Sequence, residues 1–119
     1  MNLAGSPVFV CAVFLGFAGP TLADAPARVA AGARLAQDVG KGNCLACHSL
    51  PSDANAATSA NIGPPLVNIS ARFPDRQQLR RQVWDAGVAN PDTIMPPFGK
   101  HQILTKEEID LIVDYLYTL

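Results

Sequence analysis

Apolar residues recur at helical spacing near the end of the chain. They are Ile109, Ile112, Val113 and Leu116. At this spacing the four side chains lie on one face of a helix, which is typical of a helix that packs on a core. Thr105 stands where an N-cap is expected, with Glu108 as its capping-box partner. Leu104 and Ile109 fit the hydrophobic staple that accompanies such a cap. We therefore expect a helix that begins after Thr105 and buries this stripe.

A second helical pattern covers residues 29–39. Its expected core face consists of Gly32, Leu35, Ala36 and Val39. Residues 24–28 contain a proline and are expected to form a short disordered lead. Glycines at positions 40 and 42 then break the helix. We expect this helix to cross the last one, with Gly32 allowing a close approach near Tyr115.

The middle of the chain predicts shorter elements joined by long loops. Residues 49–60 are small and polar and read as a surface loop, either variable filler or a partner-binding segment. A short helical turn is expected at 68–73. Asp75 then resembles an N-cap with Gln78 as its capping-box partner, for a helix that runs to about Asp85 and buries Leu79 and Val83. Prolines forbid regular structure over much of 87–101. The pattern as a whole predicts an all-α domain.

The first 23 residues differ from the rest because no charged side chain occurs before Asp24. Residues 8–18 form an apolar run of 11 residues, which is too short to span a bilayer. Small residues follow it, and 21–23 offer a cleavage site. We therefore interpret residues 1–23 as a secretory signal peptide, although no Lys or Arg precedes the apolar run. An uncleaved interfacial anchor is the alternative. Export from the cytoplasm and a single mature domain, residues 24–119, follow from this interpretation.

Composition narrows the class of function. The formal net charge is −1, and no basic block occurs, which argues against a nucleic-acid partner. Of the three cysteines, Cys11 lies in the expected leader, so the mature domain keeps only Cys44 and Cys47. A domain of this size has a thin core, and a large apolar cofactor would add to it.

The two remaining cysteines belong to the motif Cys44-Leu45-Ala46-Cys47-His48, which is typical of a c-type haem attachment site. Two thiols three residues apart lie on one face of a helical turn, where both can form thioethers to one porphyrin edge. His48 follows directly and can act as an axial ligand of the iron. A thioredoxin-like pair or half of a zinc site are the alternatives, but the first requires a βαβ context and the second another CxxC, and this chain has neither.

Residues 61–66 follow the loop and read Asn61-Ile62-Gly63-Pro64-Pro65-Leu66. The two prolines hold the chain extended. A carbonyl of this segment could accept the proton of the outer nitrogen of His48 and so fix the tautomer and orientation of the ring. An ordinary turn is the alternative.

Met95 is the only methionine of the mature domain and stands in the loop sequence Ile94-Met95-Pro96-Pro97-Phe98-Gly99. Two prolines stiffen the backbone after it, which suits a ligand that must stay in place. Its thioether is a soft, neutral ligand that favours Fe(II) over Fe(III). A packing role for Met95 is one alternative, and His101 is the rival ligand.

Trp84 and the basic residues near it have open roles. The indole N–H of Trp84 could bind a haem propionate, or the ring could simply pack in the core. Four arginines cluster in this part of the chain: Arg72, Arg76, Arg80 and Arg81. They suggest a solvated helix face, a propionate contact or a partner-facing patch.

The order of these features resembles the class I cytochromes c over the whole mature domain. The shared features are an N-terminal helix, CxxCH, a Gly-Pro-x-Leu turn, a methionine in a proline-flanked loop and a C-terminal helix with Tyr-Leu. The resemblance implies a small helical domain wrapped around one covalent haem c. It further implies that Cys44 and Cys47 hold the haem, that His48 and Met95 are the axial ligands, and that the carbonyl of Pro64 orients His48.

A closer resemblance, over roughly 32–119, is to the SoxX family, the small monohaem subunits of the bacterial Sox sulfur-oxidising system. It is carried by Gly42-Asn43 with the CxxCH motif, by 61–66, by Arg72-Phe73-Pro74-Asp75, by 94–101, and by the ends of the last helix, 103–105 and 116–119. The resemblance implies a periplasmic heterodimer with SoxA, a dihaem or monohaem cytochrome subunit. The SoxAX complex couples thiosulfate oxidatively to a cysteine of the SoxYZ carrier, an L-cysteine S-thiosulfotransferase activity, and its electrons pass to a soluble cytochrome.

This chain supplies residues for electron transfer and none for catalysis. No free thiol would remain after haem attachment, and two axial ligands would leave the iron no open position for a substrate. The expected sulfur chemistry therefore belongs to the partner subunit. A free-standing, diffusible cytochrome c shares every haem residue and is the alternative function. A haem-free thiol–disulfide oxidoreductase is a third hypothesis.

Overall fold

The computed structural model describes residues 24–58 and 60–119, so the expected signal peptide at 1–23 lies outside the described residues. Over the described ranges every regular element is helical, which confirms the all-α prediction. The α-helices are α1 (Ala25–Gln37), α2 (Ile69–Arg72), α3 (Arg76–Trp84) and α4 (Lys106–Leu116). Two 3-10 turns, η2 (Cys44–Ala46) and η3 (Ala86–Val88), lie in the connections.

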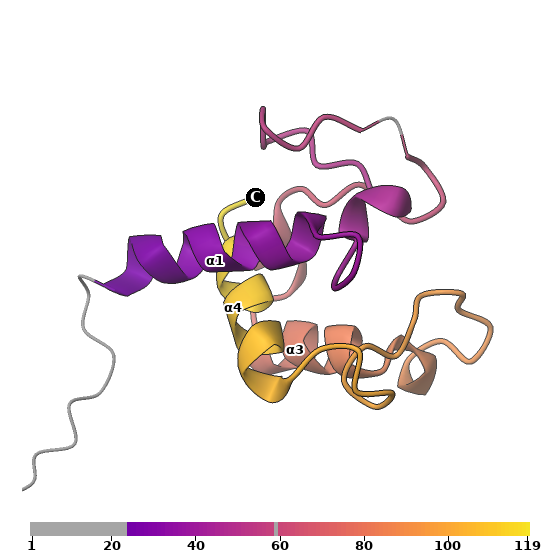
Figure 1. Cartoon of the computed structure of the whole chain (residues 1–119). Helices are drawn as coiled ribbons and strands as arrows, with labels where there is room; N and C mark the ends of the chain where they lie inside the picture. The colour runs from indigo at the N-terminus through magenta and orange to yellow at the C-terminus, as the bar shows by residue number, and fades with distance from the viewer. Residues whose placement is uncertain (1–23, 59) are drawn as a thin grey trace, which may run out of the picture.

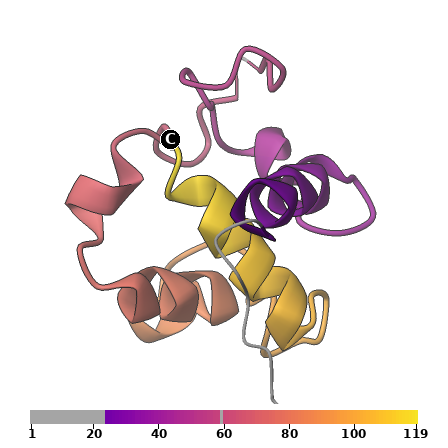
Figure 2. The ribbon, with the colours of Figure 1, turned by 90° about the vertical axis from the view of Figure 1, so that its left-hand side faces the viewer.

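The crossing of α1 and α4 organises the fold, as Figures 1 and 2 show. Gly32 of α1 lies directly on the backbone of α4. A Cβ atom at this position would be 2.0 Å from the carbonyl oxygen of Leu111 and 2.9 Å from Cβ of Tyr115. Only glycine permits this approach, so the close crossing near Tyr115 that the sequence predicts is confirmed.

Helix α4 begins as its sequence predicts. The hydroxyl of Thr105 accepts a hydrogen bond from the backbone N–H of Glu108 at 3.1 Å, and the Glu108 carboxylate accepts one from the N–H of Thr105 at 2.9 Å. Both halves of the capping box are therefore present. The predicted stripe is buried, together with Leu104 and Tyr115. These side chains form the core with residues of α1, α3 and the loops.

Helix α3 packs beside α4 and is joined to it by ion pairs. Arg80 Nε donates to a carboxylate oxygen of Asp110 at 2.6 Å. Asp114 accepts from Arg76 of α3 and also from Arg28 of α1, so it links three helices. Arg76 and Arg80 thus take a role that was not among the three suggested by the sequence, because α4 supplies acidic partners. These side chains remain partly exposed, and each pair contributes at most about 1 kcal/mol.

The bounds of α1 differ from the prediction at both ends. The helix already begins at Ala25, because Pro26 lies in its first turn, where a missing N–H costs nothing. Residues 25–28 are thus helical rather than a disordered lead. At the other end, the carboxylate of Asp38 accepts from the N–H of Gly40 at 2.8 Å and turns the chain away. Val39 therefore lies outside the helix and is 83% exposed, so its predicted place in the core is wrong.

The cap of α3 also differs in detail. The carboxylate of Asp75 accepts from the N–H of Gln77 at 2.8 Å, which makes Asp75 the N-cap as predicted. The donor is two residues on rather than three, and the backbone N–H of Gln78 instead donates to the carbonyl of Asp75 at 2.9 Å. The other carboxylate oxygen of Asp75 lies 3.4 Å from Arg81. The predicted capping box is replaced by an Asx-type cap with an ion pair.

The loop at 49–58 lacks regular structure, as predicted, but it is more than a surface segment. Leu50 and Ala56 are each only 2% exposed and belong to the core. Asp53 accepts a hydrogen bond from the hydroxyl of Tyr115 at 2.6 Å, which ties the loop to α4. Thr58 donates to the carbonyl of Leu45 at 3.0 Å, inside the CxxCH motif. The loop is therefore packed against the candidate site.

Candidate haem site

The CxxCH motif forms a single tight turn that begins at Cys44, after the connection 38–43 that follows α1. Asn43 enters it in the left-handed region, with φ at 45°, a conformation that asparagine tolerates. The backbone N–H groups of Cys47 and His48 both donate to the carbonyl of Cys44, at 3.2 and 2.9 Å. Gly42 allows the turn to lie against α1, because a Cβ there would be 2.7 Å from the carbonyl oxygen of Leu35. The turn places both cysteines and the histidine in one short segment.

Cys44 and Cys47 are free, half-buried thiols. Burial raises the pKa of Cys44 to about 11, even though a backbone hydrogen bond acts in the opposite direction. A reactive thiol of an oxidoreductase needs a lowered pKa, since the thiolate is the nucleophile. The environment of Cys44 instead favours a neutral sulfur, either a thiol or a thioether. Cys44 is therefore not set up as the nucleophile of a thiol–disulfide oxidoreductase.

The imidazole of His48 is held by the carbonyl of Pro64. Nδ1 of His48 lies 2.7 Å from this oxygen. A carbonyl oxygen only accepts, so Nδ1 carries a proton, and in the neutral imidazole Nε2 then keeps a free lone pair. This is the tautomer that a metal ligand requires, and such a hydrogen bond is the usual way in which it is fixed.

Gly63 provides the surface on which the imidazole rests. A Cβ at this position would be 2.3 Å from Cε1 of His48, closer than real contacts allow. The N–H of Gly63 donates to the carbonyl of Cys47 at 2.8 Å, and the N–H of Leu66 donates to the carbonyl of Ser49, also at 2.8 Å. The Gly-Pro-Pro-Leu segment thus runs alongside the CxxCH turn. The sequence pointed to this segment but not to the role of Gly63, which the direct contact with the ring reveals.

Met95 comes from a separate loop between α3 and α4. Its side chain is half-buried and packs against the core, and its N–H donates to the hydroxyl of Thr93 at 3.2 Å. The following turn is fixed by Phe98, whose carbonyl accepts from the N–H groups of Ile103 and Leu104. In Figure 1, η2 and this loop both lie to the right of the α1–α4 crossing, with η2 above and the loop below.

Trp84 supports the base of the Met95 loop. A Cβ at Gly99 would be 2.1 Å from Cε3 of the indole, so Gly99 lies flat on the ring. The carbonyl of Trp84 accepts from the N–H groups of Gly99 and Lys100, at 3.1 and 3.3 Å. Arg80 lies over the ring at 5.8 Å from its centroid. A packing role for Trp84 is therefore visible, and sequence reasoning missed its partner Gly99.

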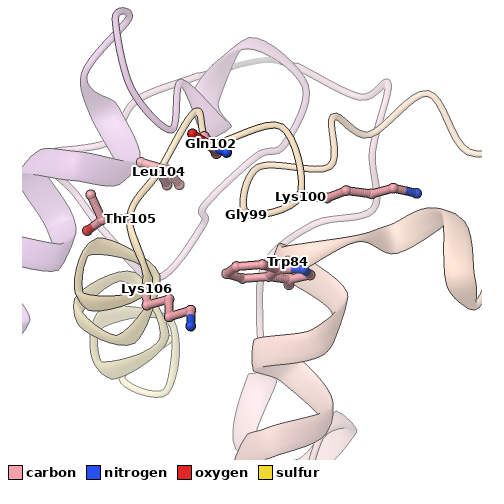
Figure 3. A pocket seen from close by; sticks show the side chains of 7 residues that line it. All are labelled: Trp84, Gly99, Lys100, Gln102, Leu104, Thr105 and Lys106. Carbon is pink, nitrogen blue, oxygen red and sulfur yellow. The ribbon is translucent and has the colours of Figure 1, made fainter.

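A pocket of about 460 Å³ lies beside this ring, between the Met95 loop and the start of α4. Figure 3 shows its lining residues: Trp84, Gly99, Lys100, Gln102, Leu104, Thr105 and Lys106. Lys100 forms an ion pair with Asp85 at 2.9 Å, and this hydrogen bond lowers the pKa of the Asp85 carboxyl. His101, the rival ligand, is an exposed residue of the same loop.

The donor groups fit a c-type haem. The CxxCH turn offers two neutral sulfurs and an imidazole with a free Nε2, and the loop of Met95 offers a neutral thioether. Over 24–58 and 60–119, no group of three or more His, Cys, Asp or Glu side chains could hold a metal ion. In the same ranges no helix is long and apolar enough to cross a membrane.

Comparison with known proteins agrees with this geometry. Residues 27–116 match the family described as cytochrome c oxidase, cbb3-type, subunit III. The crystal structure of SoxXA from P. pantotrophus is similar to this chain with a TM-score of 0.67 and 27% identity, covering 75% of this chain and 79% of that one. The c-type cytochrome SorU from Sinorhizobium meliloti gives a TM-score of 0.52 and 27% identity, covering 78% and 91% of the two chains.

One sequence relative is an uncharacterized lipoprotein of Aquifex aeolicus, 36% identical over 77 residues. The match covers 65% of this chain but spans only 36% of the relative's length. The helical fold, the family match over three quarters of the chain and the similarity to SoxXA agree with one another. This family implies haem c as the cofactor and electron transfer as the function of the protein. The chain therefore belongs to the family of cytochrome c oxidase, cbb3-type, subunit III, and is a SoxX-like class I cytochrome c.

Proposed function

We propose that this chain is the periplasmic, monohaem electron-transfer subunit of a SoxAX-type complex. In this proposal it forms a heterodimer with a SoxA-like cytochrome that couples thiosulfate oxidatively to a cysteine of a SoxYZ-type carrier. The electrons leave through a soluble cytochrome. The observation that carries the proposal is the similarity to SoxXA, which extends over 79% of that chain. The residues of the candidate site supply the chemistry.

Cys44 and Cys47 would hold one haem through two thioethers, with His48 and Met95 as axial ligands. When bound, the haem supplies a one-electron couple. Pro64 keeps the proton on Nδ1 of His48 and fixes the orientation of the ring, so that Nε2 would be available to bind the iron. Met95 adds a neutral sulfur, which favours the reduced state. Two protein ligands leave no place for a substrate, so the subunit moves electrons and the sulfur chemistry takes place on its partner.

The first test separates the complex from a freely diffusing carrier. The mature protein is purified from its own host, and the intact masses of all bound chains are measured. A chain heavier by one haem, together with an equal amount of a second haem protein, is the expected result. A haem-bearing chain that elutes alone at low and high salt would favour the diffusible carrier. A chain without haem would contradict the haem assignment itself.

Met95→Ala tests the ligand set. We expect the covalent haem to remain, the visible spectrum to change as the sixth position opens, and the reduction potential to fall, because the soft ligand is lost. Ile94→Ala is the matched control, since Ile94 is the exposed neighbour and offers no ligand. A Met95→Ala protein with the spectrum and potential of the wild type would show that Met95 is not a ligand.

A further inference from the structure

The segment that carries the Pro64 carbonyl has few supports of its own. Pro64 and Pro65 are exposed and, as prolines, have no N–H to donate. On one side the segment is bonded through Gly63 and Leu66 to residues directly beside His48. These bonds tie the segment to the CxxCH turn, and the side chain of Leu66 packs against the core. A hydrogen-bonded link to the helical core comes from the opposite side.

Arg72 provides that support. Its Nη1 donates to the carbonyl of Pro65 at 2.8 Å and lies 3.4 Å from the carbonyl of Val67. Pro65 directly follows the residue whose carbonyl holds His48. A hydrogen bond from a guanidinium is charge-assisted and stronger than a neutral one. Arg72 therefore holds the peptide unit next to the one that orients the imidazole.

The backbone of Arg72 is itself held in place by contacts with the rest of the domain. It belongs to α2, a single turn that would not be stable alone. Asn68, with φ at 51°, reverses the chain ahead of α2. The N–H of Ile69 donates to the carbonyl of Leu119 at 3.1 Å, and the side chain of Ile69 is only 1% exposed. The hydroxyl of Tyr117 donates to the carbonyl of Phe73. The turn is thus attached at both ends to the residues that follow α4.

We propose that Arg72 is a positioning residue for His48: it connects the end of α4, through α2 and the Pro64–Pro65 segment, to the imidazole. The side-chain hydrogen bonds of Arg72 go to the backbone carbonyls of Pro65 and Val67, beside the residue that holds His48. Arg80 and Arg81 instead pair with acidic side chains, and Arg76 contacts the Asp114 carboxylate and the carbonyl of Asp110, both on α4. This proposal rests on the proposed function in one respect, because it takes His48 as the ligand of the iron.

The test measures how fast the Nδ1 proton of His48 exchanges with solvent in the reduced haem protein, by NMR. In Arg72→Ala we expect this proton, and the N–H groups of Gly63 and Leu66, to exchange about tenfold faster, because the segment opens more often without its charged donor. Amides in the middle of α1 and α4 should keep their wild-type rates. Arg72→Lys keeps a charged donor and should restore part of the protection.

Arg81→Ala is the matched control, because the Arg81 side chain is 69% exposed and pairs with the carboxylate of Asp75. It should leave exchange at His48 unchanged. Where Arg72→Ala gives no haem protein, Arg72→Gln, which is shorter and neutral, carries the same expectation.

Two results would overturn the proposal. Unchanged exchange at His48, with the resonances next to the haem propionates displaced, would assign Arg72 to a propionate instead. Equal acceleration at His48 and throughout α1 and α4 would reduce Arg72 to general support of the fold. A wild-type protein without covalent haem would be a different failure, that of the proposed function, and mass measurement before the exchange experiment detects it.

Discussion

Gly32→Ala tests the crossing of α1 and α4 on which the fold depends. An added Cβ would lie 2.0 Å from the carbonyl oxygen of Leu111, whereas ordinary contact begins at 3.4 Å. The helices would have to separate by about 1.4 Å at this point. The atom in the way belongs to helix backbone, which cannot rotate aside as a side chain does. Relief therefore requires movement of a whole helix.

The expected cost follows from two opposing effects. Alanine is a better helix former than glycine by about 1 kcal/mol. Overpacking of a tight contact costs about 1–3 kcal/mol, and a clash with backbone belongs at the upper end of this range. We therefore expect Gly32→Ala to lower the free energy of unfolding by about 2 kcal/mol. In a domain of this size, that lowers Tm by roughly 8–16 °C.

Unfolding of the purified protein, followed by circular dichroism against urea and temperature, measures this cost. Ala30→Gly is the matched control, because Ala30 lies on the exposed side of the same helix. There only the helix preference acts, and the change to glycine should cost about 1 kcal/mol. Alanine should therefore give the more stable protein at position 30, and glycine the more stable protein at position 32 of the same helix. A Gly32→Ala protein as stable as the wild type would refute the close crossing.

Two further predictions concern the neighbourhood of His48 and the loop at 49–58. In Gly63→Ala the added methyl group should displace the imidazole of His48 and lengthen its hydrogen bond to the Pro64 carbonyl. We expect the visible spectrum of the haem protein to change and the free energy of unfolding to fall by about 1–3 kcal/mol. Tyr115→Phe should cost about 1 kcal/mol at pH 7 in urea unfolding, because the half-exposed Asp53 carboxylate can replace the lost hydroxyl with water. This cost should shrink below about pH 4, because the Tyr115 hydroxyl lowers the pKa of the Asp53 carboxyl from 3.8 in the folded state.

The sign of that pH dependence follows from linkage. A carboxyl whose pKa is lowered by folding contributes stability above its unfolded pKa, and this stability is lost as the pH falls through the folded value. The Tyr115 hydroxyl, whose pKa is raised by burial and by Asp53, remains protonated at neutral pH and acts as the donor. A difference between wild type and Tyr115→Phe that stays constant down to pH 2 would contradict the assigned bond. An unchanged spectrum in Gly63→Ala would contradict the contact between Gly63 and the ring.

The parts of the fold that could be predicted from the sequence are those that depend on residues close together in the chain. The capping box at Thr105 and Glu108 requires only residues three positions apart, and the buried stripe of α4 follows from helical periodicity. The CxxCH turn is equally local. Gly32 is predictable as well, because a glycine on the core face of a helix indicates that a second helix approaches closely there. In each case the information lies within one or two turns of the chain.

The parts that sequence missed depend on contacts between distant residues or on competing local bonds. Nothing in the sequence pairs Asp53 with Tyr115, which are 62 positions apart, or sets Gly99 against Trp84. Val39 continues the helical period in the sequence, but the helix ends before it, where the backbone N–H of Gly40 donates to the carboxylate of Asp38. Such outcomes are decided by tertiary packing and by the relative strength of neighbouring hydrogen bonds.

The pairing of α1 with α4 has a consequence for the order of folding. Within the described residues the first helix packs on the last one, so α1 lacks its main partner until residues near 116 have been synthesised. Until then the CxxCH segment belongs to an open chain with both thiols accessible. Modification of these cysteines can therefore precede folding, and a chain cut short before α4 should remain a substrate for modification without ever becoming a folded domain.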